Sequence, residues 1–260
     1  MRCRKSVVTL LLIAISMALM VVPAKAKESN VIIVNSSNSA QNLNYIVYVP
    51  DNVSAATPVF LFLHGDSESN ADIYKITQHF TFMRLLLDGS WKPDFIFVMP
   101  INKKKGNWLK VTKSVNTILD EVTRNYGGSL DNMYIGGSSA GSDAVIFYQA
   151  AGRFKGGICM AGNIGDEDHL ITPEQIMSLW SDRKLFYYRD NLDYRGGYGW
   201  DPVYFYDAAL SSITYNVKFT IINTDWAHDY KLVDRVFLPE YMTDSKGQNC
   251  YDAINHLIYG

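Results

Sequence analysis

Residues 133–144 read MYIGGSSAGSDA, so three glycines and three serines directly follow a short apolar run. Within this stretch, residues 137–141 have the form G-x-S-x-G, a pattern typical of a tight strand-to-helix turn that exposes a serine hydroxyl. A flexible turn would also collect such residues, because Gly tolerates positive φ and Ser hydrogen-bonds to its own backbone. The pattern becomes informative when a base, an acid and an oxyanion loop accompany it. We therefore take Ser139 as a candidate nucleophile.

A serine hydroxyl is a weak nucleophile until a base removes its proton, and the base needs an acid that fixes its orientation. His228 lies in the segment NTDWAHDY, directly after the last apolar run, and is our candidate base. Asp193 lies between Ser139 and His228 in the chain and is our candidate acid. Serine, then acid, then histidine is one of the chain orders in which such triads occur.

Two other aspartates remain alternatives for the acid. Asp190 closely follows the apolar run at residues 185–188, and Asp201 precedes Pro202 at the start of a helical pattern. An aspartate ahead of proline often caps a helix, so Asp201 also has a purely structural explanation. We favour Asp193 over both.

Attack on a carbonyl creates an oxyanion that must meet two preorganised N–H donors. One donor comes from the residue after the nucleophile and the other from an early strand-to-helix loop. Ala140 and Asp66 are the candidates, the latter in the segment LFLHGD at residues 61–66. Gly65 allows the backbone to turn sharply there. Because His64 precedes the serine in the chain, we expect His64 to brace this loop rather than to act as the base.

Short apolar runs recur along the chain and predict the strands that position these residues. Several runs are continuous rather than alternating, which is typical of strands buried on both faces. Apolar residues spaced at three and four predict helices over residues 72–87 and 108–126. The sequence therefore predicts an α/β fold: a mainly parallel central sheet of about eight strands with an antiparallel start and helices on both faces. The predicted strands are residues 31–34, 45–49, 59–63, 95–98, 133–135, 157–161, 185–188 and 218–222.

Two long stretches interrupt the succession of predicted strands and helices. Residues 164–183 form an acidic loop with a helical tail at 173–180, and residues 187–206 are crowded with Tyr, Trp, Gly and Asp. Loops of this length are usually functional lids or binding loops. The aromatic side chains could form a platform for sugar or aryl groups, although packing of the lid is the favoured interpretation. They are Tyr187, Tyr188, Tyr194, Tyr198 and Trp200.

Residues 1–26 have the features of a secretory signal. They combine three basic residues within the first five positions, an apolar run over 6–22 and the small-x-small site Ala-Lys-Ala at 24–26. The alternative is an uncleaved membrane anchor, because the run approaches spanning length. We expect residues 27–260 to form one domain that is secreted or periplasmic, with no stable membrane association after cleavage.

The charge balance bears on the partners of the chain. The sequence carries 24 basic and 26 acidic residues. Residues 1–26 contain four basic and no acidic residues, so the remaining chain has 20 basic residues and a net charge of about −6. This balance argues against nucleic acid as a partner. We expect the Lys103-Lys104-Lys105 run to be a solvated loop.

Two cysteines, Cys159 and Cys250, remain after the predicted signal. A disulfide between them is permitted in an exported protein, and burial of Cys159 as a small hydrophobic residue is the alternative. The chain has neither C-x-x-C nor the His/Cys spacing of a zinc site. We therefore expect no metal site, and the mechanism expected for Ser139 needs no cofactor.

Three segments of the sequence resemble the α/β-hydrolase superfamily, specifically the secreted esterases grouped with polyhydroxybutyrate depolymerases, feruloyl esterases and acetylxylan esterases. Residues 44–69 look like the opening strands and oxyanion loop of these enzymes, residues 126–144 like their strand, nucleophile turn and helix, and residues 226–230 like their histidine loop. The sequence departs from relatives at Ser142, where many carry glycine, and at Asp66, where a small or neutral residue is common. We expect only the Asp66 N–H to be used.

The resemblance implies a serine hydrolase, most simply a carboxylic-ester hydrolase that acts on a small-molecule or polysaccharide-linked ester through an acyl-enzyme. Ser139, His228 and Asp193 would form the triad, with Asp66 and Ala140 in the oxyanion hole. A peptidase or amidase of the same fold and a non-catalytic binding module on the same scaffold are the alternatives, because fold alone does not determine chemistry.

Overall fold

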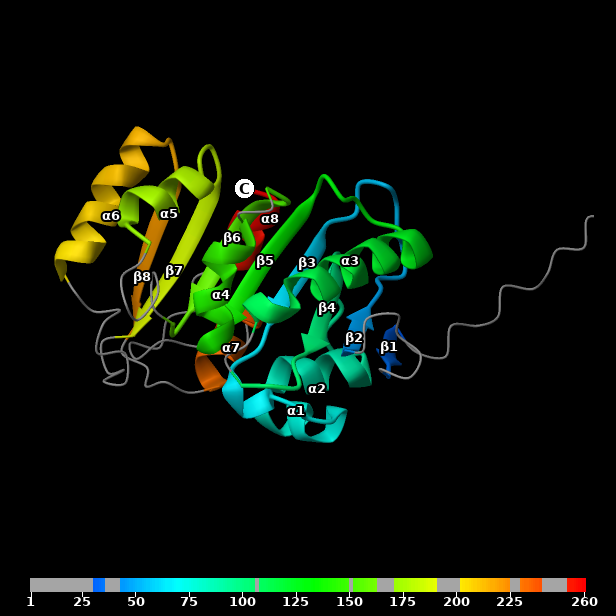
Figure 1. The fold of residues 1–260 in the computed structure, drawn as a ribbon. Helices are drawn as coiled ribbons and strands as arrows, with labels where there is room; N and C mark the ends of the chain where they lie inside the picture. Colours follow the sequence, from blue (N-terminus) through cyan, green and yellow to red (C-terminus); the bar gives the residue numbers. More distant parts are fainter. Residues whose placement is uncertain are drawn as a thin grey trace, which may run out of the picture.

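A single sheet runs through the computed structural model, in the order β1-β2-β4-β3-β5-β6-β7-β8 (Figure 1). The structure describes residues 30–35, 43–105, 108–149, 152–162, 171–190, 202–224, 230–239 and 252–260. The strands are β1 (Val31–Val34), β2 (Asn44–Tyr48), β3 (Val59–Leu63), β4 (Ile96–Ile101), β5 (Met133–Ser138), β6 (Phe154–Met160), β7 (Lys184–Asp190) and β8 (Lys218–Thr224). The first two pairings, β1 with β2 and β2 with β4, are antiparallel, and the other five are parallel. The predicted fold class is confirmed.

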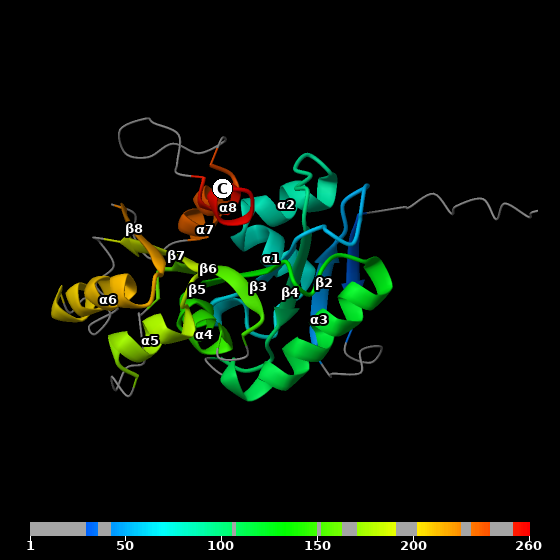
Figure 2. The same cartoon turned by 90° about the horizontal axis from the view of Figure 1, so that it is seen from above.

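Helices cover both faces of the sheet, as Figure 2 shows from above. One face carries α3 (Thr112–Tyr126), α4 (Ala140–Tyr148), α5 (Pro173–Leu179) and α6 (Pro202–Thr214). The other carries α1 (Ile73–His79), α2 (Thr81–Asp88), α7 (Tyr230–Phe237) and α8 (Ala253–Ile258). Strands β3 to β5 are apolar because both of their faces are covered, and all five β3 residues are fully buried.

Two predicted helices differ from the observed ones. The predicted helix over 72–87 is two helices, because Phe80 has an extended backbone (φ −115°, ψ 115°) between α1 and α2 and buries its ring in the core. The predicted helix over 108–126 begins with a short 3₁₀ helix, η2 (Leu109–Val111), and the α-helix starts at Thr112. Several strands extend beyond their predicted ends, most clearly β5, which continues through Gly136 to Ser138.

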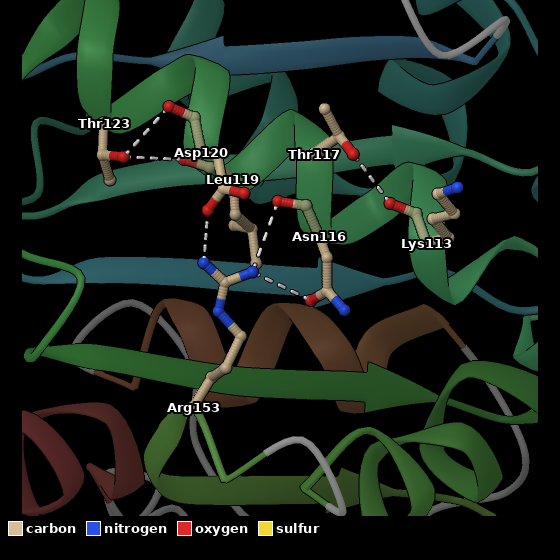
Figure 3. A network of polar contacts seen from close by, with 7 residues as sticks. All are labelled: Lys113, Asn116, Thr117, Leu119, Asp120, Thr123 and Arg153. Carbon is tan, nitrogen blue, oxygen red and sulfur yellow. Dashed lines mark hydrogen bonds and ion pairs between the residues drawn. The ribbon is translucent and has the colours of Figure 1, made fainter.

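A polar network fixes α3 to the chain that enters β6 (Figure 3). The Arg153 guanidinium donates to the Asp120 carboxylate at 2.5 Å and to the side-chain oxygen of Asn116 at 3.1 Å. A planar guanidinium suits this double contact, because its donors are held in a fixed fork. The network joins the helix before β5 to the strand after α4, and so steadies the frame around the β5–α4 turn.

On the opposite face, Asp234 of α7 accepts a hydrogen bond from the Phe82 N–H at 2.9 Å. Both residues are buried, so this bond caps the start of α2 inside the protein. It anchors α7, the element that follows the segment containing His228.

Tyr187 and Tyr188 lie in β7 and are buried in the two opposite cores. These two rings pack the core and do not form a platform, whereas Tyr194, Tyr198 and Trp200 lie outside the described residues. Residues 1–29, with the predicted signal, also lie outside them. Among the helices that the structure describes, none has both the length and the apolar character needed to cross a membrane.

Candidate active site

Ser139 occupies the bend between β5 and α4 and has a backbone conformation that L-residues rarely adopt. Its φ is 54° and its ψ is −125°. This ψ is far from the left-handed helical value of about +47°, so the residue is strained even among positive-φ residues. The Ser139 N–H donates to Met160 at the end of β6 at 2.9 Å, and the Ser139 carbonyl accepts from Asp143 in the first turn of α4 at 3.1 Å. The predicted sharp turn at Ser139 is therefore present.

The two glycines of the motif are needed because α4 packs very closely against the strands. A Cβ added to Gly137 would collide with the main chain of Gly141, and a Cβ added to Gly141 would collide with the main-chain oxygen of Leu63 in β3. Main-chain atoms cannot move aside as a flexible side chain can. The motif therefore brings the N-terminus of α4 against β3, whose end carries the candidate oxyanion loop.

The chain after β3 turns at Gly65 into the short 3₁₀ helix η1 (Asp66–Glu68). A Cβ at Gly65 would stand 3.2 Å from the Ser139 Cβ, so the two turns are in contact. Ala140 is the first residue of α4, and the first N–H groups of a helix lack partners within the helix and carry its positive dipole end. The structure therefore brings Ser139, Ala140 and the turn before Asp66 together.

His64 is buried at the end of β3, and both of its ring nitrogens have partners. Its Nε2 accepts from the Asn102 N–H at 2.9 Å, so Nδ1 carries the proton and donates to the Gly65 carbonyl at 2.6 Å. Burial lowers the pKa of His64 to about 4, which keeps the ring neutral. His64 therefore braces the loop as predicted.

The same bonds fix the direction of the Asp66 N–H. The Gly65 carbonyl accepts from His64 Nδ1 and, at 3.3 Å, from the Glu68 N–H. None of the described peptide bonds is cis, and in a trans peptide the N–H points away from the carbonyl of the same plane. The Asp66 N–H therefore points away from the His64 ring.

Trp108 and Tyr148 also support this loop, and sequence reasoning missed both. The Trp108 indole N–H donates to the His64 carbonyl at 3.0 Å, and its ring packs edge-on against the His64 imidazole with centroids 4.8 Å apart. The Tyr148 hydroxyl of α4 donates to the Trp108 carbonyl at 2.8 Å. No local sequence pattern predicts these two hydrogen bonds, because each joins residues about 40 positions apart in the sequence.

Glu68 and His79 form a second support that sequence reasoning missed. Glu68 is 1 % exposed, and its carboxylate lies 2.6 Å from His79 Nδ1 at the end of α1. Burial raises the pKa of the Glu68 carboxyl above its usual range, while the hydrogen bond with His79 opposes that shift. The pair ties η1 to α1.

The candidate base His228 and the candidate acids Asp193 and Asp201 lie outside the described residues. Asp190, the remaining alternative, is the last residue of β7. The strands that flank these positions end at the same edge as Ser139, because β5, β6, β7 and β8 are parallel and in register from Ser138 through Met160 and Tyr188 to Ile222.

Cys159 is a free, fully buried thiol beside Ser142. Of the two expectations for this residue, burial as a small hydrophobic side chain is the one observed, and a disulfide with Cys250 is not. Burial raises the pKa of the Cys159 thiol to about 12, so it is protonated and unreactive. Within the described ranges, no group of three His, Cys, Asp or Glu side chains is arranged to hold a metal ion.

A pocket of about 640 Å³ lies at the opposite edge of the sheet, where β6, β7 and β8 begin. It contains neither Ser139 nor Asp66. Its charged lining residues are Lys155, Asp182, Arg183, Lys184 and Lys218.

Comparison with solved structures identifies the fold. A chain from Klebsiella pneumoniae assigned to the dienelactone hydrolases superposes with a TM-score of 0.61 at 12 % identity, over 88 % of this chain and 98 % of that one. A ferulic acid esterase gives 0.53 at 16 % identity, over 78 % and 92 %. An acetyl xylan esterase from Aspergillus awamori gives 0.53 at 13 % identity, over 76 % and 94 %. The chain has the α/β-hydrolase fold.

No known family profile matches this sequence, and no curated protein is similar to it. The α/β-hydrolase fold is therefore recognised from three-dimensional similarity, at identities that establish the fold alone. Within this fold, the strained Ser139 lies at the carboxyl edge of the parallel strands, where ligands bind in open α/β sheets.

Proposed function

We propose that this protein is a serine hydrolase, and specifically a carboxylic-ester hydrolase. The observation that carries the proposal is the conformation of Ser139, a strained serine at the first turn of a helix, in contact with the glycine turn that precedes Asp66. A strained, non-glycine residue at a ligand-binding edge is a recognised sign of a functional site.

In the proposed reaction, the Ser139 Oγ attacks the ester carbonyl carbon while His228 takes the hydroxyl proton. The N–H groups of Ala140 and Asp66 stabilise the negative oxygen of the tetrahedral intermediate. The intermediate collapses, His228 returns the proton to the departing alkoxide, and an alcohol leaves. Water, activated by His228, then attacks the acyl-serine and releases the carboxylic acid. Asp193 orients His228 throughout, with Asp190 and Asp201 as alternatives.

Esters are the favoured substrates on two grounds. The sequence resembles secreted esterases at the three segments that carry the chemistry, and two of the structural neighbours named above are a ferulic acid esterase and an acetyl xylan esterase. The predicted signal fits a secreted or periplasmic enzyme that meets small-molecule or polysaccharide-linked esters. The resident chemistry requires no cofactor, because the nucleophile, base and oxyanion donors all come from the chain.

The test compares Ser139→Ala with Ser138→Ala, which changes the neighbouring serine of the same motif. Turnover of p-nitrophenyl acetate should fall by at least about a thousandfold in Ser139→Ala and change little in Ser138→Ala. Retained ester hydrolysis in Ser139→Ala would place the nucleophile elsewhere. Faster wild-type turnover of peptide p-nitroanilides than of p-nitrophenyl esters would replace the esterase with a peptidase.

A further inference from the structure

Glu68 is a buried acid with no role in the reaction proposed above. Carboxylates are almost never fully buried unless they are paired, because burial removes the hydration that stabilises their charge. Glu68 is 1 % exposed and lies in η1, immediately after the turn that presents the Asp66 N–H. A buried carboxylate at this position requires hydrogen-bond partners. Those partners identify the elements that Glu68 connects.

The Glu68 carboxylate connects α1 to the oxyanion turn. Its Oε1 atom is bonded to His79 at 2.6 Å. Burial raises the pKa of this carboxyl, and the bonds with His79 and with the main chain at Glu68 and Gly65 oppose that shift. The point where a Gly65 Cβ would stand is 3.5 Å from Glu68 Oε2 and 3.2 Å from the Ser139 Cβ. The carboxylate and the candidate nucleophile thus lie against the same glycine.

The peptide plane between Gly65 and Asp66 lies beside this contact. The carbonyl between Gly65 and Asp66 is held by His64 on one side and by the Glu68 N–H on the other. The N–H of the same plane, that of Asp66, is the proposed oxyanion donor. Because an oxyanion donor must be aimed before the reaction starts, a small rotation of this plane weakens transition-state stabilisation without changing the fold.

We propose that Glu68, clamped by His79, is a positioning residue that aims the Asp66 N–H at the oxyanion. This inference rests on the proposed hydrolase function and deepens it. Glu68 touches neither substrate nor the reacting atoms in this account. It acts through the turn at Gly65, so its loss lowers kcat and leaves KM nearly unchanged.

The first experiment measures kcat and KM for p-nitrophenyl acetate, with active-site concentration determined by fluorophosphonate titration. We expect Glu68→Ala to lower kcat by about 10-fold to 100-fold, part of the loss seen when an oxyanion donor is removed, with KM within about twofold. Glu68→Gln keeps the shape and one acceptor oxygen that can still receive the His79 hydrogen bond, so it should retain more of kcat than Glu68→Ala. Glu174→Gln, which changes an exposed glutamate at the start of α5, is the matched control.

The second experiment separates positioning from simple structural support. Asp66→Pro removes the proposed donor N–H, and proline is tolerated at the first position of a helix after an extended residue such as Gly65. Asp66→Ala keeps the N–H, so the difference in kcat between Asp66→Pro and Asp66→Ala measures the effect of the N–H alone. If Glu68 acts through this N–H, Glu68→Ala should lower kcat by less than about twofold in the Asp66→Pro background.

Each outcome decides the inference. Unchanged kcat in Glu68→Ala, or an equal loss with and without the Asp66 N–H, would overturn it. If Glu68→Ala does not fold, His79→Ala replaces it. Loss of the His79 contact with Glu68 should also lower kcat and leave KM unchanged. An unaltered kcat in His79→Ala would likewise overturn the inference. A wild type that neither reacts with the fluorophosphonate nor hydrolyses esters would instead overturn the hydrolase function, and this inference with it.

Discussion

The two edges of the sheet are built in opposite ways. At the carboxyl edge, the buried polar side chains His64, Glu68 and Asn102 belong to the loops beside Gly65, whose turn contacts the strained Ser139. At the amino edge, Lys184 donates to the main-chain oxygens of His256 at 2.8 Å and Gly260 at 2.5 Å, next to a pocket lined by further basic residues. Positive φ occurs there at Asp182 and Asn216, which are residue types that tolerate it.

This difference shows where the fold accepts destabilising features. Buried polar groups and strained backbone each cost free energy, and they persist only where the surroundings hold them in place. The carboxyl edge concentrates both around one serine, whereas the amino edge places its charges near solvent. We interpret the carboxyl edge as the functional one.

The largest expected effect is at Gly141. Gly141→Ala forces a Cβ into the main chain of Leu63, so we expect a loss of more than about 4 kcal/mol in unfolding free energy, or failure to fold. Urea unfolding followed by circular dichroism measures it.

Gly152, before β6, is the control, because its φ is +68° and no atom lies within 4 Å of the added Cβ. Gly152→Ala should cost only about 1–2 kcal/mol, from the backbone conformation alone. Equal losses of unfolding free energy in Gly141→Ala and Gly152→Ala would mean that Gly141 is not packed more closely than Gly152.

The next effect is the pH dependence that His64 gives to stability. In the folded protein its pKa is about 4, whereas the ordinary value is 6.5. Between pH 7 and pH 4 the unfolded chain therefore binds a proton that the folded chain does not, so this contribution lowers stability by about 3 kcal/mol as pH falls.

Urea unfolding of the wild type and of His64→Gln at pH 7 and pH 4 isolates this contribution. The wild type should lose more stability than the variant between the two values. The same pH dependence in both proteins would mean that the pKa of His64 is not lowered by folding.

A smaller effect tests the strain at Ser139 directly. Glycine adopts φ 54° and ψ −125° readily, whereas alanine does not, so Ser139→Gly should be more stable than Ser139→Ala by about 1 kcal/mol. Thermal unfolding of the two inactive variants measures the difference. Equal melting temperatures would argue against strain at this position.

The smallest effect is expected at the amino edge. Lys218 pairs with Lys184 across β7 and β8, and burial together with the Lys218 charge lowers the pKa of Lys184. Lys218→Gln removes this repulsion and should change stability by less than about 0.5 kcal/mol, towards greater stability, with kcat unaltered. A marked loss of activity would give the amino edge a functional role.

Much of the sheet could be predicted from the sequence, because strands covered on both faces are continuous apolar runs such as β3. Strand ends were less predictable where small residues continue the pairing, as at Gly136 and Gly137 in β5. The break at Phe80 was missed because its ring fits the apolar spacing of one continuous helix.

The candidate site was predictable in part. Ser139 and the Gly65 turn follow from motifs whose chemistry is local, and the structure brings them into contact. The roles of Glu68, His79 and Trp108 were not predictable, because acidic, histidine and tryptophan side chains acquire partners only through the tertiary fold. The assignments of His228 and Asp193 remain predictions from chain order.

The most direct test of the central claim is to treat the folded protein with a fluorophosphonate and locate the adduct by peptide mass spectrometry. We expect one phosphonate per chain on Ser139, and none on protein unfolded in urea before treatment. A folded protein that stays unlabelled, or that carries the adduct on another residue, would contradict the assignment of Ser139 as the nucleophile.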